Sequence, residues 1–291
     1  MKPNNYTRRD FMTLLGMGAA ALTFSGPNLT EKKKSNASLG FQLYTVRHQV
    51  ETDLEGTIRK IAGMGYVGVE TYALPPNLTL ANAAKIFKEC GLKVFSMHTE
   101  LPVGKQQEDV LRMADAYQCD HVVYAGWPQG DKYKDLEAIQ RTAHLYDEIA
   151  VYLKSKGLHF GLHNHWWEFE KTDNVYPFYY LLRHLSPNIF FEIDTYWAKT
   201  GGMNPSKVVA DFGKRAPFLH IKDGPAIKGD KGYDQVPAGK GTMDFPSIVE
   251  AAGKNTEWMI VEFDEYKGDI FEGMNASAVF LTSKGLAKGK V

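Results

Sequence analysis

Residues 136–169 have the sequence LEAIQRTAHLYDEIAVYLKSKGLHFGLHNHWWEF. The part from Leu136 to Lys156 is typical of an amphipathic helix, and Gly157 is the kind of residue that commonly ends one. The run His159–His165 follows directly and is typical of a buried strand. A helix joined to a strand in this way is a repeat unit of an α/β fold.

Seven further segments show the same strand pattern, and helical stretches separate them. Together with His159–His165, the predicted strands are Gly40–Arg47, Tyr66–Tyr72, Leu92–Thr99, His121–Ala125, Ile189–Thr195, Phe218–Asp223 and Met259–Phe263. Their starts lie roughly 26 to 40 residues apart, the size of one βα unit. Eight such units favour a single-domain α/β fold, the (β/α)8 TIM barrel. An open dinucleotide-binding sheet is disfavoured, because no glycine fingerprint follows the first strand.

The first 38 residues precede this pattern. The paired arginines Arg8 and Arg9 are followed by an apolar run from Leu14 to Phe24. This order indicates a twin-arginine-type signal peptide over residues 1–30, a linker over 31–38 and the barrel over 39–291. The apolar run is shorter than the roughly 20 residues that cross a bilayer. We therefore expect a periplasmic protein with no stable membrane span after processing.

The overall charge is balanced, with 34 basic and 34 acidic residues and a pI near 7.1. No basic stripe stands out, so nucleic acid is not an expected partner. Two cysteines, Cys90 and Cys119, are too few for a disulfide framework. Whether the protein forms a homodimer stays open.

Ionisable side chains gather at the ends of six of the eight predicted strands, where TIM barrel enzymes carry their active sites. They are Glu70, His98, His163, His165, Glu192, Asp194, His220, Lys222 and Glu262. Residues two apart in a strand share a face, so His163 pairs with His165 and His220 with Lys222. Imidazoles and carboxylates from several strands suit Mn, Zn, Co or Fe better than calcium. For any single residue, a satisfied polar group in the core is the competing interpretation.

The order of motifs at these strand ends resembles the xylose isomerase-like TIM barrel family of sugar phosphate isomerases/epimerases, and in particular its exported HNHxxEF-type members. The motifs are GLHNHWWEF at 161–169, FEIDTYW at 191–197, HIKD at 220–223, GKGTMDF at 239–245 and VEF at 261–263. The resemblance extends from about Leu39 to the C-terminus and implies one divalent metal ion. The implied ligands are His163, Asp194, His220 and Glu262. Many relatives carry a glutamate where this chain has His163.

The resemblance and the side-chain chemistry together suggest a metal-dependent sugar isomerase or epimerase, which removes a proton next to a carbonyl and forms a metal-stabilised enediolate. The predicted catalytic residues are His165 as the base, Lys222 and His98. The predicted substrate-binding residues are Glu70, Glu168, Trp166, Trp197 and Tyr44, and the substrate is a small carbohydrate. Two alternative interpretations stay open. Lys222 would be an ion-pair partner of Asp194 or Glu192 and not a catalytic group, and the tryptophans would pack the top of the barrel and not bind sugar.

Three other functions compete with this prediction. A periplasmic 3-keto-glycoside lyase or hydratase would use the same enolate, and export favours it because free sugar phosphates are mainly cytoplasmic. An endonuclease IV-like repair enzyme shares the barrel but needs more metal ligands than this chain offers. A non-catalytic sugar-binding protein is the fourth candidate. The glycine-rich segment Gly224–Thr242 is predicted to be either a lid over the site or a plain surface loop.

Overall fold

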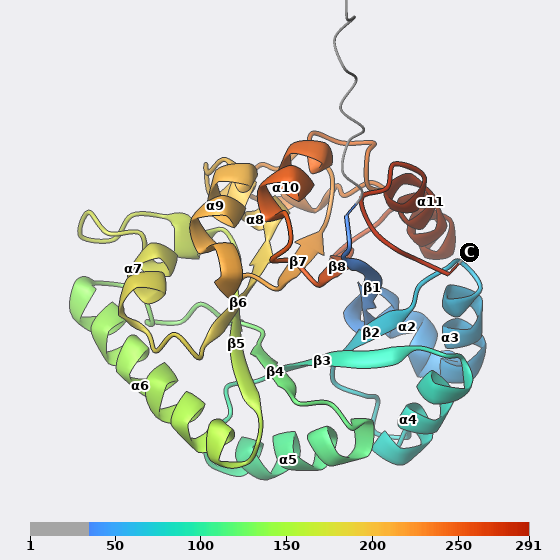
Figure 1. Cartoon of the computed structure of the whole chain (residues 1–291), viewed down its shortest axis with the longest axis horizontal. Coiled ribbons are helices and arrows are strands. Elements are labelled where there is room, and N and C mark those ends of the chain that lie inside the picture. Colours follow the sequence, from blue (N-terminus) through green and yellow to red (C-terminus); the bar gives the residue numbers. More distant parts are fainter. Residues whose placement is uncertain (1–34, 291) are drawn as a thin grey trace, which may run out of the picture. The chain divides into compact units, whose positions relative to one another are not determined.

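The computed structural model describes residues 35–290, which form a closed barrel of eight strands in the order β1 to β8 (Figure 1). The strands are β1 (Ser38–Gln42), β2 (Gly68–Thr71), β3 (Lys93–Thr99), β4 (His121–Tyr124), β5 (His159–His163), β6 (Phe190–Asp194), β7 (Phe218–Ile221) and β8 (Trp258–Val261). Neighbouring strands are parallel, and β1 pairs with β8 to close the ring. The predicted TIM barrel is confirmed, whereas the predicted signal peptide lies outside the described residues.

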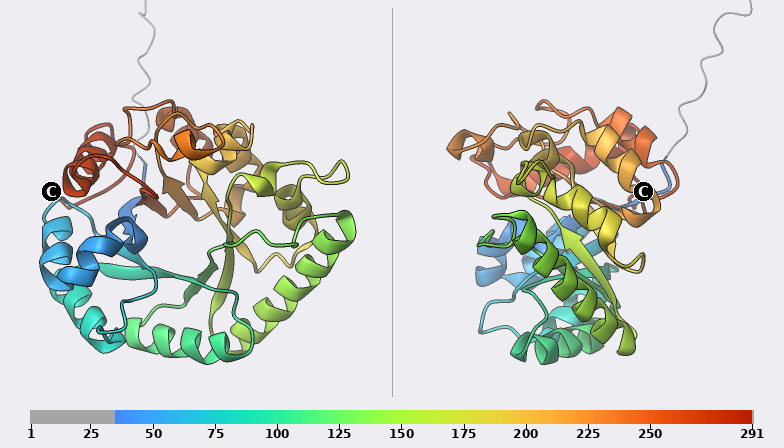
Figure 2. Two further views of the ribbon diagram at one scale, coloured as in Figure 1. Left: turned by 180° about the vertical axis from the view of Figure 1, so that it is seen from behind. Right: turned by 90° about the vertical axis from the view of Figure 1, so that its left-hand side faces the viewer.

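Helices surround the barrel on its outside (Figure 2). They are α2 (Arg47–Thr52), α3 (Leu54–Ala62), α4 (Leu80–Glu89), α5 (Lys105–Tyr117), α6 (Leu136–Ser155), α7 (Pro177–His184), α8 (Thr195–Thr200), α9 (Pro205–Phe212), α10 (Phe245–Ala252) and α11 (Ile270–Ser283). The 3-10 turns are η1 (Leu43–Val46), η2 (Trp167–Phe169), η3 (Gly213–Arg215) and η4 (Asp230–Tyr233). Aspartates cap several helices; Asp135, for example, accepts the Ala138 N–H at the start of α6. None of the helices within residues 35–290 combines the length and apolar character that crossing a bilayer requires.

The first strand is shorter than predicted, because β1 ends at Gln42 instead of continuing to Arg47. The Gln42 side-chain oxygen accepts the Tyr44 N–H at 2.8 Å, and this bond turns the chain into η1. Leu43 and Val46 remain buried after the turn. The apolar character of the segment Gly40–Arg47 therefore continues past the end of β1, so its hydrophobic pattern did not indicate the turn at Gln42.

The amino-terminal half of the barrel interior is filled by aromatic rings. Phe95 and Trp258 stack with ring centroids 3.9 Å apart, and Phe218 packs edge-on against Phe95 at 5.7 Å. Gly161 on β5 makes room for this layer, because a Cβ there would lie 2.3 Å from the Phe190 ring. This apolar layer closes one end of the barrel.

The carboxyl-terminal half of the interior is polar. On β7 and the residue after it, inward positions run from Phe218 through His220 to Lys222, and all three are buried. Beside them, Trp258 at the start of β8 is followed four residues later by Glu262. Ionisable side chains are therefore brought together at the carboxyl-terminal end of the barrel. The aromatic layer separates them from water at the amino-terminal end.

Candidate active site and metal centre

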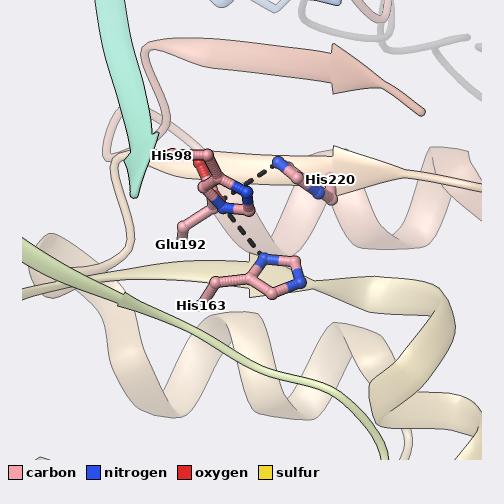
Figure 3. Close-up of side chains that lie close together, drawn as sticks. All are labelled: His98, His163, Glu192 and His220. Atoms are coloured by element: carbon pink, nitrogen blue, oxygen red, sulfur yellow. Dashed lines mark hydrogen bonds and ion pairs between the residues drawn. The ribbon is translucent and has the colours of Figure 1, made fainter. Parts of the chain in front are cut away.

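Four buried side chains meet at the carboxyl-terminal end of the barrel: His98 from β3, His163 from β5, Glu192 from β6 and His220 from β7 (Figure 3). Glu192 Oε2 lies 2.8 Å from His98 Nε2, 3.2 Å from His163 Nδ1 and 3.1 Å from His220 Nε2. Each residue offers one ligand atom, and these atoms lie within 4.8 Å of one another. This buried His/Glu cluster could bind a divalent metal ion.

Asp194, His220 and Glu262 form a second group on the other side of His220. Their ligand atoms also lie within 4.8 Å of one another, so this group too could bind a metal ion. His220 Nδ1 lies 2.6 Å from Glu262 Oε2 and 3.9 Å from Asp194 Oδ2. The predicted ligands are thus divided between two groups that share His220, with His163 in the first group and the two carboxylates in the second. Sequence reasoning left Glu192 and His98 out of the ligand set, although both end predicted strands.

The donor atoms fit a metal ion. Among the described residues, Glu192 Oε1 of the first group is buried without a hydrogen-bond partner, and Asp194 Oδ2 and Glu262 Oε2 of the second group have ion-pair contacts only. A buried carboxylate oxygen that lacks a partner is costly, and a cation would satisfy it. Imidazole nitrogens mixed with carboxylate oxygens suit Zn, Mn, Co or Fe.

The charges inside this cluster are strongly coupled. Burial alone would raise the pKa of Glu192, but the charges of His220 and His98 outweigh it and hold that pKa well below its usual value. Burial alone would lower the pKa of His220, but Glu192 and Glu262 outweigh it and raise that pKa well above its usual value. Burial lowers the pKa of His163 to about 3. At neutral pH, His220 therefore carries a proton and His163 does not.

Zinc binding is expected to strengthen as pH rises. The raised pKa keeps His220 protonated at neutral pH, and a ligating ring nitrogen must lose its proton, so binding releases one proton. The affinity should rise about tenfold per pH unit in the neutral range. Calorimetric titration with zinc in buffers of different ionisation enthalpy measures both the affinity and the proton count. An affinity that does not change with pH would contradict this assignment.

The HNH turn after β5 is locked to the end of β6. Asn164 Nδ2 donates to the Asp194 carbonyl oxygen at 3.1 Å, and Asn164 Oδ1 accepts the Asp194 N–H at 3.0 Å. Glu168 Oε2 accepts the His165 N–H at 2.8 Å, and burial raises the pKa of Glu168 to about 8. Asp194 Oδ1 caps α8 through the Trp197 N–H, which leaves Oδ2 for the interior. These bonds set the positions of His163 and His165 relative to Asp194.

His165 lies beside the cluster and is held by an aromatic stack. Its ring is 4.2 Å from that of Trp167 at an interplanar angle of 12°, and 5.2 Å from the His163 ring. Within residues 35–290, its Nδ1 has no hydrogen-bond partner. Burial, helped by the charges of His163 and Lys222, lowers the pKa of His165 well below its usual value. This imidazole is therefore unprotonated at neutral pH and can accept a proton.

The two predicted tryptophans are buried to different extents. Trp197 is only 2% exposed and lies 5.4 Å beneath the Lys222 ammonium, while Trp166 is partly exposed and packs on Trp197. Trp127, which sequence analysis did not single out, is 59% exposed, and its ring lies 5.7 Å from that of His165. Trp127 lies in the loop that follows β4, and loops after the strands of a TIM barrel carry its active site. This position in the sequence could have identified Trp127 as a candidate site residue.

The loop that carries Trp127 is fixed by Lys132. The Lys132 ammonium donates to the Gly126 carbonyl at 2.8 Å and to the Pro128 carbonyl at 2.6 Å, one on each side of Trp127. It also donates to Tyr124 Oη at 2.7 Å. The exposed indole is therefore presented from an ordered loop.

The remaining predicted residues lie around the same end of the barrel. Glu70 is fully buried and its Oε1 accepts from His220 Nε2 and Gln42 Nε2, each at 2.9 Å, so it orients the His220 ring. Tyr44 packs edge-on against Tyr72 with ring centroids 5.0 Å apart. The substrate contacts of Glu70, Glu168, Trp166, Trp197 and Tyr44 stay predictions.

A cavity of about 600 Å³ lies away from this cluster, on the outside of the barrel, and is lined by residues of α7 and α9. Among its lining residues, Tyr179 Oη and Lys207 Nζ both donate to the Asp211 carboxylate. The cavity is lined by neither candidate metal group nor His165, so it is separate from the candidate active site.

Comparisons with known proteins agree with the barrel and with its family. Residues 58–283 match the profile of the family described as xylose isomerase-like TIM barrel. A sugar phosphate isomerase/epimerase from Parabacteroides distasonis ATCC 8503 is similar in structure, with a TM-score of 0.73, 20% identity, and coverage of 87% of this chain and 96% of that one.

Two further solved structures show the same barrel. The IOLI protein with a bound zinc atom has a TM-score of 0.67 and 15% identity, and covers 85% of this chain and 99% of its own. An L-ribulose 3-epimerase has a TM-score of 0.65 and 15% identity, and covers 86% and 94%. No curated protein shows significant sequence similarity. Since the family profile spans most of the chain and the structure closes as its barrel, the chain belongs to the xylose isomerase-like TIM barrel family.

Proposed function

We propose that this protein is an exported, metal-dependent enzyme that removes the proton next to the carbonyl group of a sugar, as an isomerase or epimerase. The observation that carries the proposal is the buried Nδ1 of His165, which has no hydrogen-bond partner within residues 35–290 and whose ring lies beside the two groups that could hold a metal ion. The zinc atom of the IOLI protein and the sugar reactions in the names of the other two structures support it.

The residues that would hold the ion are His163, Asp194, His220 and Glu262, as the family resemblance implies. Two carboxylates and two neutral imidazoles balance the charge of a dication, whereas the cluster around Glu192 offers one carboxylate. A bound Zn, Mn, Co or Fe ion would polarise the carbonyl and offset negative charge that develops on its oxygen. The cluster around Glu192 is the competing location.

The protein side chains would carry the proton chemistry. His165 takes the proton from the carbon next to the carbonyl, and the electron pair of that bond moves onto the carbonyl oxygen to form an enediolate. Lys222 presents a buried positive charge that stabilises this oxygen. In an isomerase, a proton moves from one enediolate oxygen to the other and His165 returns its proton to the neighbouring carbon. In an epimerase, a second group delivers a proton to the opposite face of the same carbon.

A second candidate, a 3-keto-glycoside lyase or hydratase, is favoured by His163. An epimerase needs a second group that carries a proton to the opposite face, and burial lowers the pKa of His163 to about 3, so it carries none at neutral pH. In the elimination, the enediolate electron pair instead expels the oxygen on the next carbon. That oxygen takes up a proton and leaves as an alcohol, and an unsaturated ketone remains. Export to the periplasm would suit such unphosphorylated substrates.

The deciding experiment incubates the mature protein, with and without its metal ion, with a 3-keto-glucoside in deuterated water and follows the reaction by NMR. Deuterium at C2 that depends on the ion would support proton abstraction next to the carbonyl. An intact glycosidic bond would favour the epimerase, and a released alcohol would favour the lyase. Ion-bound protein that gives no exchange on keto-sugars or aldoses would contradict the proposal.

Substitution of Trp127 by alanine is expected to raise KM for the sugar about two- to tenfold with little change in kcat. The exposed indole beside His165 offers an aromatic face, and stacking contributes roughly 0.5–1.5 kcal/mol. Steady-state kinetics of Trp127→Ala and Trp127→Phe measure the effect, and the phenylalanine variant should retain most of the binding. Val151→Ala, which trims an exposed apolar residue on α6, is the matched control. An unchanged KM would exclude Trp127 from the substrate site.

A further inference from the structure

The ammonium group of Lys222 lies among three carboxylates. Its Nζ is 2.9 Å from Asp194 Oδ2, 2.8 Å from Glu262 Oε2 and 2.9 Å from Asp264 Oδ2, and the side chain is buried. Two of these carboxylates belong to the group that could hold a metal ion, and Asp264 does not. An ion and the ammonium group would therefore compete for the carboxylate oxygens of Asp194 and Glu262. Asp264 is the one of the three partners that would remain for Lys222 when the ion is bound.

Asp264 is held toward Lys222 by Gln235. Gln235 Nε2 donates to Asp264 Oδ2 at 2.8 Å, and Gln235 Oε1 accepts the Asp264 N–H at 2.7 Å. Gln235 is buried, so neither bond competes with bulk water. The two bonds hold the Asp264 carboxylate in place, and the side-chain bond is made to Oδ2, the same oxygen that faces the Lys222 ammonium group.

Gln235 in turn belongs to the segment Gly224–Thr242, whose ends are joined by the buried carboxylate of Asp223. Four backbone N–H groups donate to this carboxylate: Gly224 at 2.9 Å, Gly239 at 2.9 Å, Gly241 at 2.9 Å and Met243 at 3.1 Å. Val236 N also donates to the Asp223 carbonyl oxygen at 2.9 Å. These bonds tie the segment to Asp223, and the segment places Gln235 where it can hold Asp264.

We propose that Asp264 is a positioning residue that takes over the Lys222 ammonium group when Asp194 and Glu262 bind the metal ion. This inference rests on the proposed metal site. With Asp264 in place, the ammonium group keeps one carboxylate partner and remains beside the ion, where it can stabilise an oxyanion. Without Asp264, the ammonium group and the ion share two carboxylates, and the ion binds more weakly.

The test is a double-mutant cycle on zinc affinity, measured by titration of the stripped full-length protein with zinc alone. Asp264→Asn should weaken zinc binding about tenfold, as is typical when a supporting partner of a metal site is lost. Lys222→Met should strengthen it about tenfold, because a positive charge beside the ion is removed. In the Lys222→Met background, Asp264→Asn should change the affinity less than about twofold. This dependence on Lys222 is the signature of the proposed role.

Two further variants keep the test independent of folding. Glu265→Gln removes the same charge from the neighbouring, exposed residue and should leave zinc affinity unchanged. Gln235→Ala releases Asp264 without changing any charge and should weaken zinc binding in the same direction as Asp264→Asn. Equal losses from Asp264→Asn in both backgrounds, or no loss in either, would overturn the role of Asp264. A natural sequence that binds neither zinc nor manganese would overturn the proposed function itself.

Discussion

Replacement of His220 by glutamine is expected to weaken zinc binding about a hundredfold to a thousandfold. His220 is the one residue shared by both groups that could hold an ion within residues 35–290, so its loss matters wherever the ion lies. Structural zinc sites contribute roughly 10–16 kcal/mol of binding free energy, so one ligand of four accounts for roughly 2.5–4 kcal/mol, a factor of roughly 70 to 900 in affinity. Glutamine retains hydrogen-bonding capacity toward the buried glutamates and limits the damage to the fold. The zinc content of desalted protein and calorimetric titration measure the result.

Three companion variants locate the ion and control for the loss of a histidine. His98→Gln affects only the cluster around Glu192, and Glu262→Gln affects only the group with Asp194, so the larger loss identifies the site. His121→Gln changes a histidine of β4 that pairs with Asp120 at the opposite end of the barrel and should leave zinc content unchanged. Full zinc occupancy in His220→Gln would rule out both groups.

Replacement of His165 by alanine is expected to retain zinc and to slow deuterium exchange about a hundredfold to ten-thousandfold. General-base catalysis by a positioned side chain typically contributes that factor. The loss of rate should appear in kcat, because the imidazole interacts with the substrate proton in the transition state of its transfer. Zinc should be retained because His165 is in neither metal group. NMR exchange rates and zinc content, measured on the same preparation, separate the two effects.

Chemical rescue sharpens this second prediction. The space left by the imidazole is bounded by the Trp167 ring and by Gly126, which lacks a side chain, so it can admit a free base. Added imidazole should restore part of the exchange in His165→Ala and none in His165→Gln, where the side chain still occupies the space. Exchange at the natural rate in His165→Ala would exclude His165 as the base.

The eight strands, the barrel and most residues of the two candidate metal groups could be predicted from the sequence. Strand patterns and helix stops depend on neighbouring residues, so Gly157 after α6 and the run from His159 could be read locally. In a closed parallel barrel, the carboxyl ends of all strands meet, which is why His163, His220 and Glu262 could be placed at one end before any coordinates. The turn at Gln42 was missed because the apolar pattern continues across it.

Only the tertiary structure decided which of those residues touch. Strand alternation says that Lys222 points inward, but its three partners come from β6 and from the residues after β8. Likewise, the division of the predicted ligands into two groups around His220 depends on ring orientation, which strand position does not determine. Periodicity gives the direction of a side chain, whereas distances between strands depend on barrel closure and rotamers. The local sequence therefore determined the fold and the polar residues at the carboxyl-terminal end of its strands, and packing across the barrel decided which of these residues are in contact.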